Sequence, residues 1–279
     1  MRFVWWILLV ALGSVLEAGS LVELWPEGKT PGQVTRDVET EIERNDGFRR
    51  VTNVSCPTLE LFRAKGSDSE PKPGMVICPG GGYRYTVMDK EGSHIAQWLN
   101  QVGITALVLK YRTPNNREGA LQDIQRALSM TRAQARQWNI DPKRVGVIGF
   151  SAGGNLAAKA STSFDARAYD SLDAIDQVSC RPDFAVLVYP AYLNDGKGKV
   201  AADLDLSVNV PPTLIIHTED DTRLVVGSKI YSTALKEKRI PHEFKLYRTG
   251  GHGYGLKPEG DARAWPGDAI DWLRSIGIR

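Results

Sequence analysis

Ser151, in the sequence Gly149-Phe150-Ser151-Ala152-Gly153, is the residue best suited to covalent chemistry in this chain. An apolar run before it, 144–148, predicts a buried strand, and the stretch after it, 154–160, predicts a helix. Strand, G-x-S-x-G and helix form the context of a nucleophile elbow, a sharp turn that exposes the serine hydroxyl. A glycine-rich turn without a catalytic role is the alternative, and the flanking elements favour the catalytic interpretation.

A serine hydroxyl is a weak nucleophile at neutral pH, so it needs a base, and the base needs an orienting acid. His252 lies in Gly250-Gly251-His252-Gly253, where a tight glycine loop can lower the imidazole onto the serine. His94 is expected in a helix, and His242 precedes a strand. His217 falls inside an expected buried strand and is interpreted as a core histidine. We therefore predict His252 as the base.

The acid is expected just after the strand 213–218, in the sequence Glu219-Asp220-Asp221-Thr222. Asp220 is the preferred acid, and Asp221 remains open as the alternative. Glu219 lies nearest to the strand, and Asp195 follows the previous strand. A carboxylate in this role holds the imidazole in the correct tautomer and stabilises its charged form.

The elements that must position these residues alternate between strands and helices. Strands are expected at 51–64, 74–78, 104–111, 144–148, 184–189, 213–218 and 243–247, and helices at 91–101, 118–138, 154–160, 227–238 and 262–276. This alternation predicts an α/β protein with right-handed crossovers and a mostly parallel sheet covered by helices on both faces. Ser151, Asp220 and His252 all follow strand ends, where functional groups gather in such sheets. The chain order serine, aspartate, histidine is that of the α/β-hydrolase fold.

The N-terminal residues differ from the rest of the chain. A positive charge precedes the apolar run 3–12, which is too short to span a bilayer comfortably, and Ala18-Gly19-Ser20 offers small residues for a signal peptidase. The expected organisation is a signal peptide, an irregular surface arm and an α/β-hydrolase domain, over 1–20, 21–50 and 51–279. An uncleaved membrane anchor is the alternative to the signal peptide. We expect a secreted or periplasmic protein without stable membrane association once the signal is removed.

Composition excludes several other classes of protein. The 279 residues are 42% hydrophobic and 24% charged with a net charge of +2, which is ordinary for a soluble globular chain. No basic tract with interleaved aromatics indicates nucleic-acid binding. The four histidines form no ligand-spaced pair, so no metal and no other cofactor is expected. Cys78 is expected in the core, a Cys56–Cys180 disulfide stays open, and the sequence does not indicate an oligomeric state.

Several segments together resemble the secreted α/β-hydrolase esterases, most of all the acetylxylan-esterase-like and dienelactone-hydrolase-like branch. They are Pro79-Gly80-Gly81-Gly82-Tyr83, Tyr111-Arg112, Gly149–Gly154, Val178–Phe184, Glu219-Asp220-Asp221 and Gly250–Gly253. The resemblance covers residues 50–275. It implies an oxyanion hole formed by the backbone N–H groups of Gly81, Gly82 and Ala152, and glycines leave such groups open to close approach.

Two positions depart from the pattern of this family. Asn155 stands where the family often has a histidine, and 221–226 lacks the proline that usually follows the acidic pair.

The expected activity is hydrolysis of short-chain acyl esters, most of all acetyl esters on carbohydrate such as acetylated xylan, through an acyl-enzyme. Residues 191–210 are few and polar, so no sizeable apolar lid is expected over the site. Tyr83, Tyr111 and Arg112 follow strand ends and are expected to line an open cleft, with packing and loop anchoring as the alternative role. A serine exopeptidase of the prolyl-oligopeptidase type and a non-catalytic binding protein on the same fold remain as alternative functions.

Overall fold

The computed structural model describes residues 19–65 and 70–279. Most of the expected signal peptide, residues 1–18, therefore lies outside the described residues. Within the described part, no helix is both long and apolar enough to cross a membrane.

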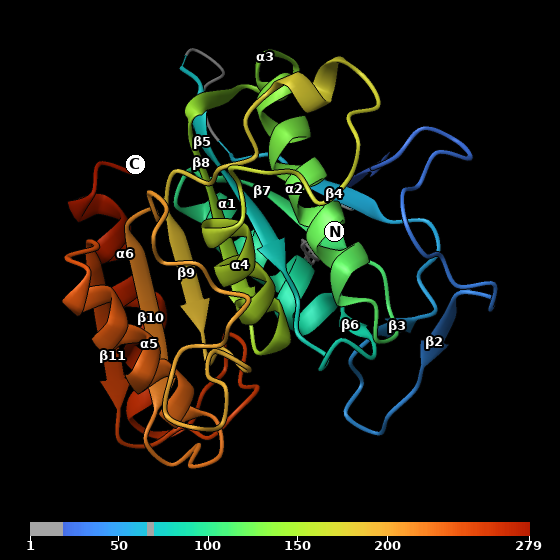
Figure 1. Cartoon of the computed structure of the whole chain (residues 1–279). Coiled ribbons are helices and arrows are strands. Elements are labelled where there is room, and N and C mark those ends of the chain that lie inside the picture. Colours follow the sequence, from blue (N-terminus) through green and yellow to red (C-terminus); the bar gives the residue numbers. More distant parts are fainter. Residues whose placement is uncertain (1–18, 66–69) are drawn as a thin grey trace, which may run out of the picture.

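An eight-stranded sheet forms the centre of the chain, in the order β1-β4-β7-β5-β8-β9-β10-β11 (Figure 1). The strands are β1 (Ser20–Glu23), β4 (Thr58–Phe62), β5 (Lys72–Cys78), β7 (Thr105–Lys110), β8 (Ile140–Phe150), β9 (Ala185–Val188), β10 (Thr213–Thr218) and β11 (His242–Tyr247). All neighbours from β7 to β11 pair in parallel, and β1 and β4 pair antiparallel. The mostly parallel sheet predicted from the alternation of elements is confirmed.

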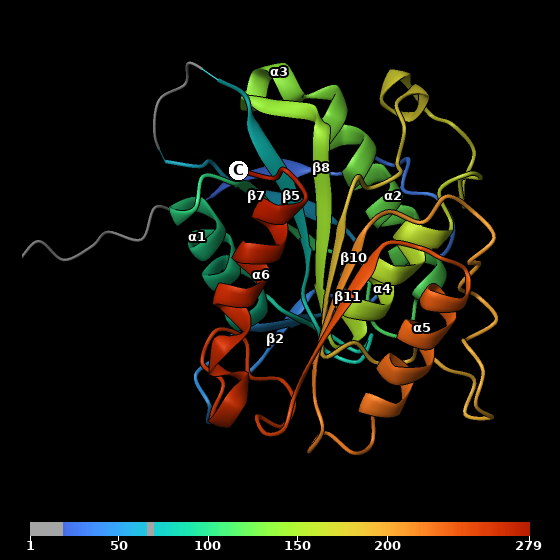
Figure 2. The same cartoon turned by 90° about the vertical axis from the view of Figure 1, so that its left-hand side faces the viewer.

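Helices cover both faces of this sheet. Figure 2 shows α1 (His94–Gln101) and α6 (Trp265–Ser275) on one face, and α2 (Arg117–Ala133), α4 (Ala152–Thr162) and α5 (Val225–Glu237) on the other. The helices on each face pack against the sheet and form a separate apolar core there. The first core includes Ile95 and Leu99, and the second includes Ile124 and Leu128. The core thus fixes the carboxyl ends of β8, β10 and β11 at one edge of the molecule.

A small antiparallel sheet accompanies the main one. It consists of β2 (Thr40–Ile42), β3 (Arg50–Thr52) and β6 (Thr86–Val87), with β3 in the middle. β6 directly follows the glycine-rich segment 79–83, so this sheet lies next to the loop that is expected to form the oxyanion hole.

The arm expected over 21–50 is irregular over most of its length, but β1, β2 and the first residue of β3 fall within or at the start of it and join the two sheets. β1 pairs with β4 and becomes the sheet's edge, so the strand expected at that edge is covered. Leu24 and Trp25 are buried, and the Trp25 indole N–H donates to Asp123 of α2 at 2.8 Å. Burial of these two large side chains holds the arm against α2.

Two helices differ from their expected bounds. The helix expected over 118–138 is divided at Gln134 into α2 and the short α3 (Ala135–Trp138), and Asn139 in a left-handed conformation (φ 53°) ends it. The helix expected from residue 91 begins with a wider π-helical turn over Asp89–Ser93 before α1 starts. That turn places the Glu91 side chain in the interior of the protein. Short 3₁₀ turns occupy Ala174–Gln177 and Gly260–Ala264.

Candidate active site

Ser151 lies at the sharp turn between β8 and α4. Its backbone has φ 53° and ψ −115°, a conformation that a non-glycine residue adopts only where its surroundings enforce it. A Cβ atom at Gly149 would lie 2.1 Å from the Gly153 carbonyl oxygen, so only glycine fits there. The Ser151 N–H donates to Val188 of β9 at 3.1 Å, which ties the turn to the sheet. The geometry is that of a nucleophile elbow.

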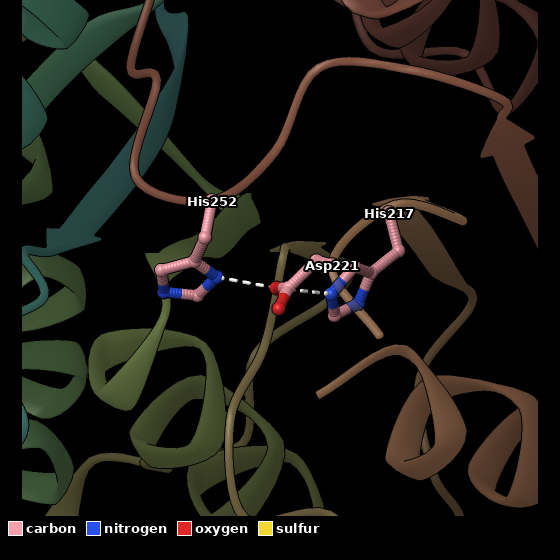
Figure 3. A group of neighbouring side chains, drawn as sticks. All are labelled: His217, Asp221 and His252. Carbon is pink, nitrogen blue, oxygen red and sulfur yellow. Dashed lines mark hydrogen bonds and ion pairs between the residues drawn. The ribbon is translucent and has the colours of Figure 1, made fainter. Parts of the chain in front are cut away.

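The glycine-rich loop after β11 brings His252 to this serine. The Ser151 Oγ and the His252 Nε2 are 2.8 Å apart, and the His252 Nδ1 lies 2.6 Å from an oxygen of Asp221. Figure 3 shows the Asp221 carboxylate between the rings of His252 and His217. Nucleophile, imidazole and carboxylate are thus connected in the order that general-base activation of a serine requires.

The preference for Asp220 as the acid is wrong. The two Asp220 oxygens accept the backbone N–H groups of Gly250 at 3.0 Å and Gly251 at 2.9 Å, so this carboxylate holds the loop that carries His252. Asp221, the alternative, turns inward and contacts the His252 imidazole directly. Asp220 is exposed and Asp221 is buried, and only a buried carboxylate can serve the imidazole away from water.

A second histidine contacts the same carboxylate oxygen. The His217 Nε2 lies 2.9 Å from Asp221 Oδ2, and its Nδ1 lies 2.7 Å from the Ser228 hydroxyl. His217 is completely buried, and this burial lowers its pKa, which favours the neutral ring. A neutral imidazole carries one N–H, so Nε2–H donates to Asp221 and Nδ1 accepts from Ser228.

Asp221 is held in its ionised form. Burial alone raises the pKa of its carboxyl, but the hydrogen bonds from His217 and His252 outweigh burial and bring the pKa well below its ordinary value. One ring nitrogen of His217, one of His252 and one carboxylate oxygen of Asp221 lie within 4.8 Å of one another, a proximity that the spacing of these residues in the sequence does not reveal. An ionised carboxylate at this place can stabilise a positive charge on the His252 imidazole.

Replacing His217 by phenylalanine is expected to lower kcat by about 10- to 100-fold, because a hydrogen bond to a charged group is lost in the interior. With one donor fewer, Asp221 binds the His252 proton more strongly, so the acidic limb of the kcat/KM profile should move to higher pH. His217→Gln keeps an N–H donor and serves as the matched control, with a smaller loss and a smaller shift. Profiles with identical acidic limbs in all three proteins would contradict this role for His217.

Gly81 and Gly82 lie with Ser151 along the wall of a cavity. In the described residues, neither of their backbone N–H groups donates to another group of the protein. Gly81 has φ +135°, and a Cβ atom there would lie 1.9 Å from the Tyr85 carbonyl oxygen, so no other residue fits. Ala152 is the first residue of α4, where a helix leaves its backbone N–H groups without partners in the preceding turn. These three N–H groups are therefore open to an oxyanion.

Sequence reasoning missed Glu91, a buried carboxyl beneath the site. It accepts the Gly80 N–H and the Tyr189 hydroxyl, both at 2.8 Å, and burial raises its pKa. The ring of Tyr189 in turn packs edge-to-face on His252 at 5.0 Å between centroids. Glu91 thus positions the glycine-rich loop and, through Tyr189, the imidazole. Its burial follows from tertiary packing, for which the sequence carries no local signal.

Tyr83, expected in the cleft, is buried and does not line the cavity. Its hydroxyl donates to Asn155 Oδ1 at 2.8 Å, and the Asn155 side-chain N–H₂ donates to the Tyr192 carbonyl oxygen at 3.1 Å. Asn155, at the position where the related family often has a histidine, therefore links the glycine-rich loop to the loop after β9.

Tyr111 and Arg112, also expected in the cleft, are fully buried. The Tyr111 hydroxyl donates to the Pro79 carbonyl oxygen at 2.8 Å, and Arg112 forms an ion pair with Asp123 at 2.9 Å. The expectation that they bind substrate is wrong, and the alternative role in packing and loop anchoring describes them.

The cavity beside Ser151 measures about 450 Å³. Its wall includes His252, Tyr85 and Tyr192 along with the glycines of the loop. Residues 191–210 form no helix and pack apolar side chains such as Leu193 and Leu204 onto the core. No helical lid is therefore built from this segment over the cavity.

The three cysteines are free thiols. Cys56 is exposed, and Cys78 and Cys180 are buried, so the disulfide left open by the sequence does not form in the structure.

Comparison with known proteins supports the same fold. A family model described as "alpha/beta hydrolase fold" matches residues 75–205. The endo-1,4-beta-xylanase B of Butyrivibrio fibrisolvens is 30% identical over 246 residues, which cover 78% of this chain and 38% of that protein. The acetylxylan esterase of Xylanibacter ruminicola is 29% identical over 208 residues, which cover 65% of this chain and 41% of that protein. The chain spans less than half the length of both relatives.

A solved structure resembles nearly the whole chain. It is described as an acetyl ester-xyloside bifunctional hydrolase from Caldicellulosiruptor lactoaceticus. The two structures align with a TM-score of 0.75 at 29% identity, over 95% of this chain and 99% of that one. The observed topology, the family match over residues 75–205 and this structural likeness agree, so the chain has the α/β-hydrolase fold.

Proposed function

We propose that this chain is a serine esterase that works through an acyl-enzyme at Ser151. The observation that carries the proposal is the connected set Ser151–His252–Asp221, with contacts of 2.8 Å and 2.6 Å. Relatives described as an acetylxylan esterase and an acetyl ester-xyloside hydrolase support this class of activity.

The proposed reaction has two halves. His252 Nε2 takes the Ser151 proton while Oγ attacks the ester carbonyl, and the negative oxygen is held by the N–H groups of Gly81, Gly82 and Ala152. His252 then protonates the departing alcohol. Water then enters and loses a proton to His252 as its oxygen attacks the acyl carbon. His252 returns this proton to the Ser151 Oγ when the bond to the acyl group breaks and the acid leaves. Asp221 stays ionised throughout and stabilises the charged imidazole.

We propose short acyl groups, most of all acetyl, as the part of the ester that becomes bound to Ser151. Residues 191–210 build no helical lid, so a long acyl chain would lack an apolar tunnel. Each methylene left in water forgoes about 0.8 kcal/mol of transfer free energy, which removes the advantage of longer chains. A sugar alcohol, in contrast, suits an open cavity, and acetylated xylan or its fragments are the proposed substrates.

Hydrolysis is expected to be fastest with acetyl esters, slower with butyryl esters and slowest with octanoyl esters of one chromogenic alcohol. Values of kcat/KM for the three esters measure this order. Acetate release from acetylated xylo-oligosaccharides, followed in the same preparations, tests the carbohydrate part. A preference for octanoyl would contradict the short-acyl proposal, and a lack of acetate release would contradict the carbohydrate proposal.

We propose that the protein is exported and that residues 1–20 are removed. The positive charge, the apolar run 3–12 and the small residues at 18–20 support this. Mass spectrometry of the protein recovered from its natural compartment should find an N-terminus at Leu21. An intact Met1 would contradict the proposal.

A further inference from the structure

Cationic side chains surround the cavity at Ser151. Arg50, Arg84, Lys90 and Arg223 all contribute to its wall. Arg84 and Arg223 are exposed, and Lys90 is half-buried. The Arg84 side chain reaches within 3.9 Å of the place where a Cβ atom of Gly82 would lie, so its charge borders the proposed oxyanion loop.

Three of these four cations have no ionic partner among the described residues. In the part of the chain that the structure describes, Arg84, Lys90 and Arg223 take part in no salt bridge. Arg50 is paired with Asp46 at one end of its guanidinium, but its buried Nε has no hydrogen-bond partner. The wall of the cavity is therefore rich in positive charge that a ligand can complement.

Negative charge is scarce on the same wall. Among the residues that the structure describes, the one carboxyl lining this wall is that of Glu91, which is buried, accepts hydrogen bonds from Gly80 and Tyr189, and has a pKa raised by burial. A chain with a net charge of only +2 thus concentrates cations at its proposed catalytic cavity. Clefts lined by one sign of charge raise the local concentration of oppositely charged substrate.

Two aromatic rings line the same cavity wall as the cations. Tyr192 is 40% exposed on the cavity wall, and the Arg117 guanidinium lies 4.4 Å from its ring centroid, which holds the ring in place. Tyr85 contributes a second ring to the wall, with Arg44 at 5.1 Å from its centroid. Flat apolar rings beside charged donors suit a pyranose, whose C–H face packs on the ring while its polar groups meet the cations.

We propose that the alcohol part of the substrate is a sugar that bears a carboxylate, so that the enzyme prefers acyl esters of acidic carbohydrate over neutral ones. The proposal deepens the esterase function and rests on it. The carboxylate is recognised by Arg84 and Arg223 at the cavity wall, while the ester carbonyl occupies the site at Ser151.

The test compares two esters that differ in one group, the methyl glycoside of tri-O-acetyl glucuronic acid and its neutral carboxamide. The ratio of their kcat/KM values is expected to favour the carboxylate by about tenfold at about 20 mM salt, and to approach one at about 500 mM, where charges are screened beyond about 4 Å. The double variant Arg84→Gln/Arg223→Gln should bring the low-salt ratio to about threefold or less. Arg274→Gln removes an exposed charge of α6 that does not line the cavity, and its ratio should equal that of the wild type.

A wild-type ratio near one at low salt, with both esters hydrolysed, would overturn the acidic-substrate proposal and leave the esterase function standing. A ratio unchanged in the double variant would overturn the assignment to Arg84 and Arg223. If the protein hydrolysed none of the three esters, that is, neither sugar ester and no chromogenic acetyl ester, the esterase function would be overturned, and the acidic-substrate proposal with it.

Discussion

Replacing Ser151 by alanine is expected to lower kcat for a chromogenic acetyl ester by about a million-fold, to the residual rate that binding and oxyanion donors alone provide. The reason is that no acyl-enzyme can form without the hydroxyl at the elbow. The alanine methyl fits the space of the serine side chain, so the fold and the cavity should persist. Steady-state kinetics together with a thermal unfolding curve measure both expectations.

Ser207→Ala is the matched control for this change, because Ser207 is an exposed serine outside the cavity. It should hydrolyse the ester at the wild-type rate. If Ser151→Ala kept more than about one hundredth of the activity, the residual oxyanion stabilisation could not account for the rate, and another nucleophile would have to exist.

Replacing Asp221 by asparagine is expected to lower kcat by about ten-thousand-fold. An asparagine carries no charge to stabilise the imidazolium, and its N–H₂ group favours the wrong tautomer of His252. It also faces the Nε2–H of His217, which needs an acceptor at that place. Measuring kcat of the variant and of the wild type over a full pH range separates the expected loss of maximal rate from a mere shift of the pH optimum.

The neighbouring aspartate provides the matched control. Asp220→Asn keeps one oxygen for the Gly250 or Gly251 N–H, so it is expected to lower kcat by at most about tenfold through a looser His252 loop. The two variants have the same change of charge and lie side by side in the chain. A larger loss from Asp220→Asn than from Asp221→Asn would reverse the roles that the geometry gives them.

The elbow could be predicted from the sequence because its determinants are local. Ser151 lies between a predicted strand and a predicted helix, and glycines flank it, so neighbouring residues alone identify the turn. The parallel sheet follows from the alternation of elements, and the sheet then brings the three strand ends together. The fold class and the pairing of Ser151 with His252 could therefore be predicted, because each strand, helix and glycine-rich turn involved is recognised from its own neighbouring residues.

The choice between Asp220 and Asp221 depends on information of another kind. Adjacent residues after a strand point in different directions, and the turn decides which of them faces His252. The turn here places Asp221 between His252 and His217 and directs Asp220 to the backbone of the glycine loop. A pattern of residue types carries no record of these side-chain directions.

Tyr83, Tyr111 and Arg112 lie in the core and not in the expected cleft for a similar reason. A position after a strand end is compatible with both a cavity wall and a core, and Arg112 reaches the core because Asp123 of α2 neutralises it there. Trp25 shows the same effect in the N-terminal arm, where the hydrogen bond from its indole N–H to Asp123 holds a mostly polar segment against the fold. Asp123 is 98 residues from Trp25 and 11 residues from Arg112, on the following helix, so neither contact is visible in the residues next to Trp25 or Arg112.

The central claim, an acyl-enzyme at Ser151, is tested most directly by labelling the protein with a fluorophosphonate and mapping the modified peptide by mass spectrometry. A serine hydroxyl attacks the phosphorus of this reagent and displaces fluoride only where a base activates the hydroxyl and donors hold the developing negative charge. We predict a single adduct on Ser151, loss of esterase activity in proportion to labelling, and no adduct in Ser151→Ala. An inactivating adduct on any other residue, or full activity after complete labelling of Ser151, would contradict the account.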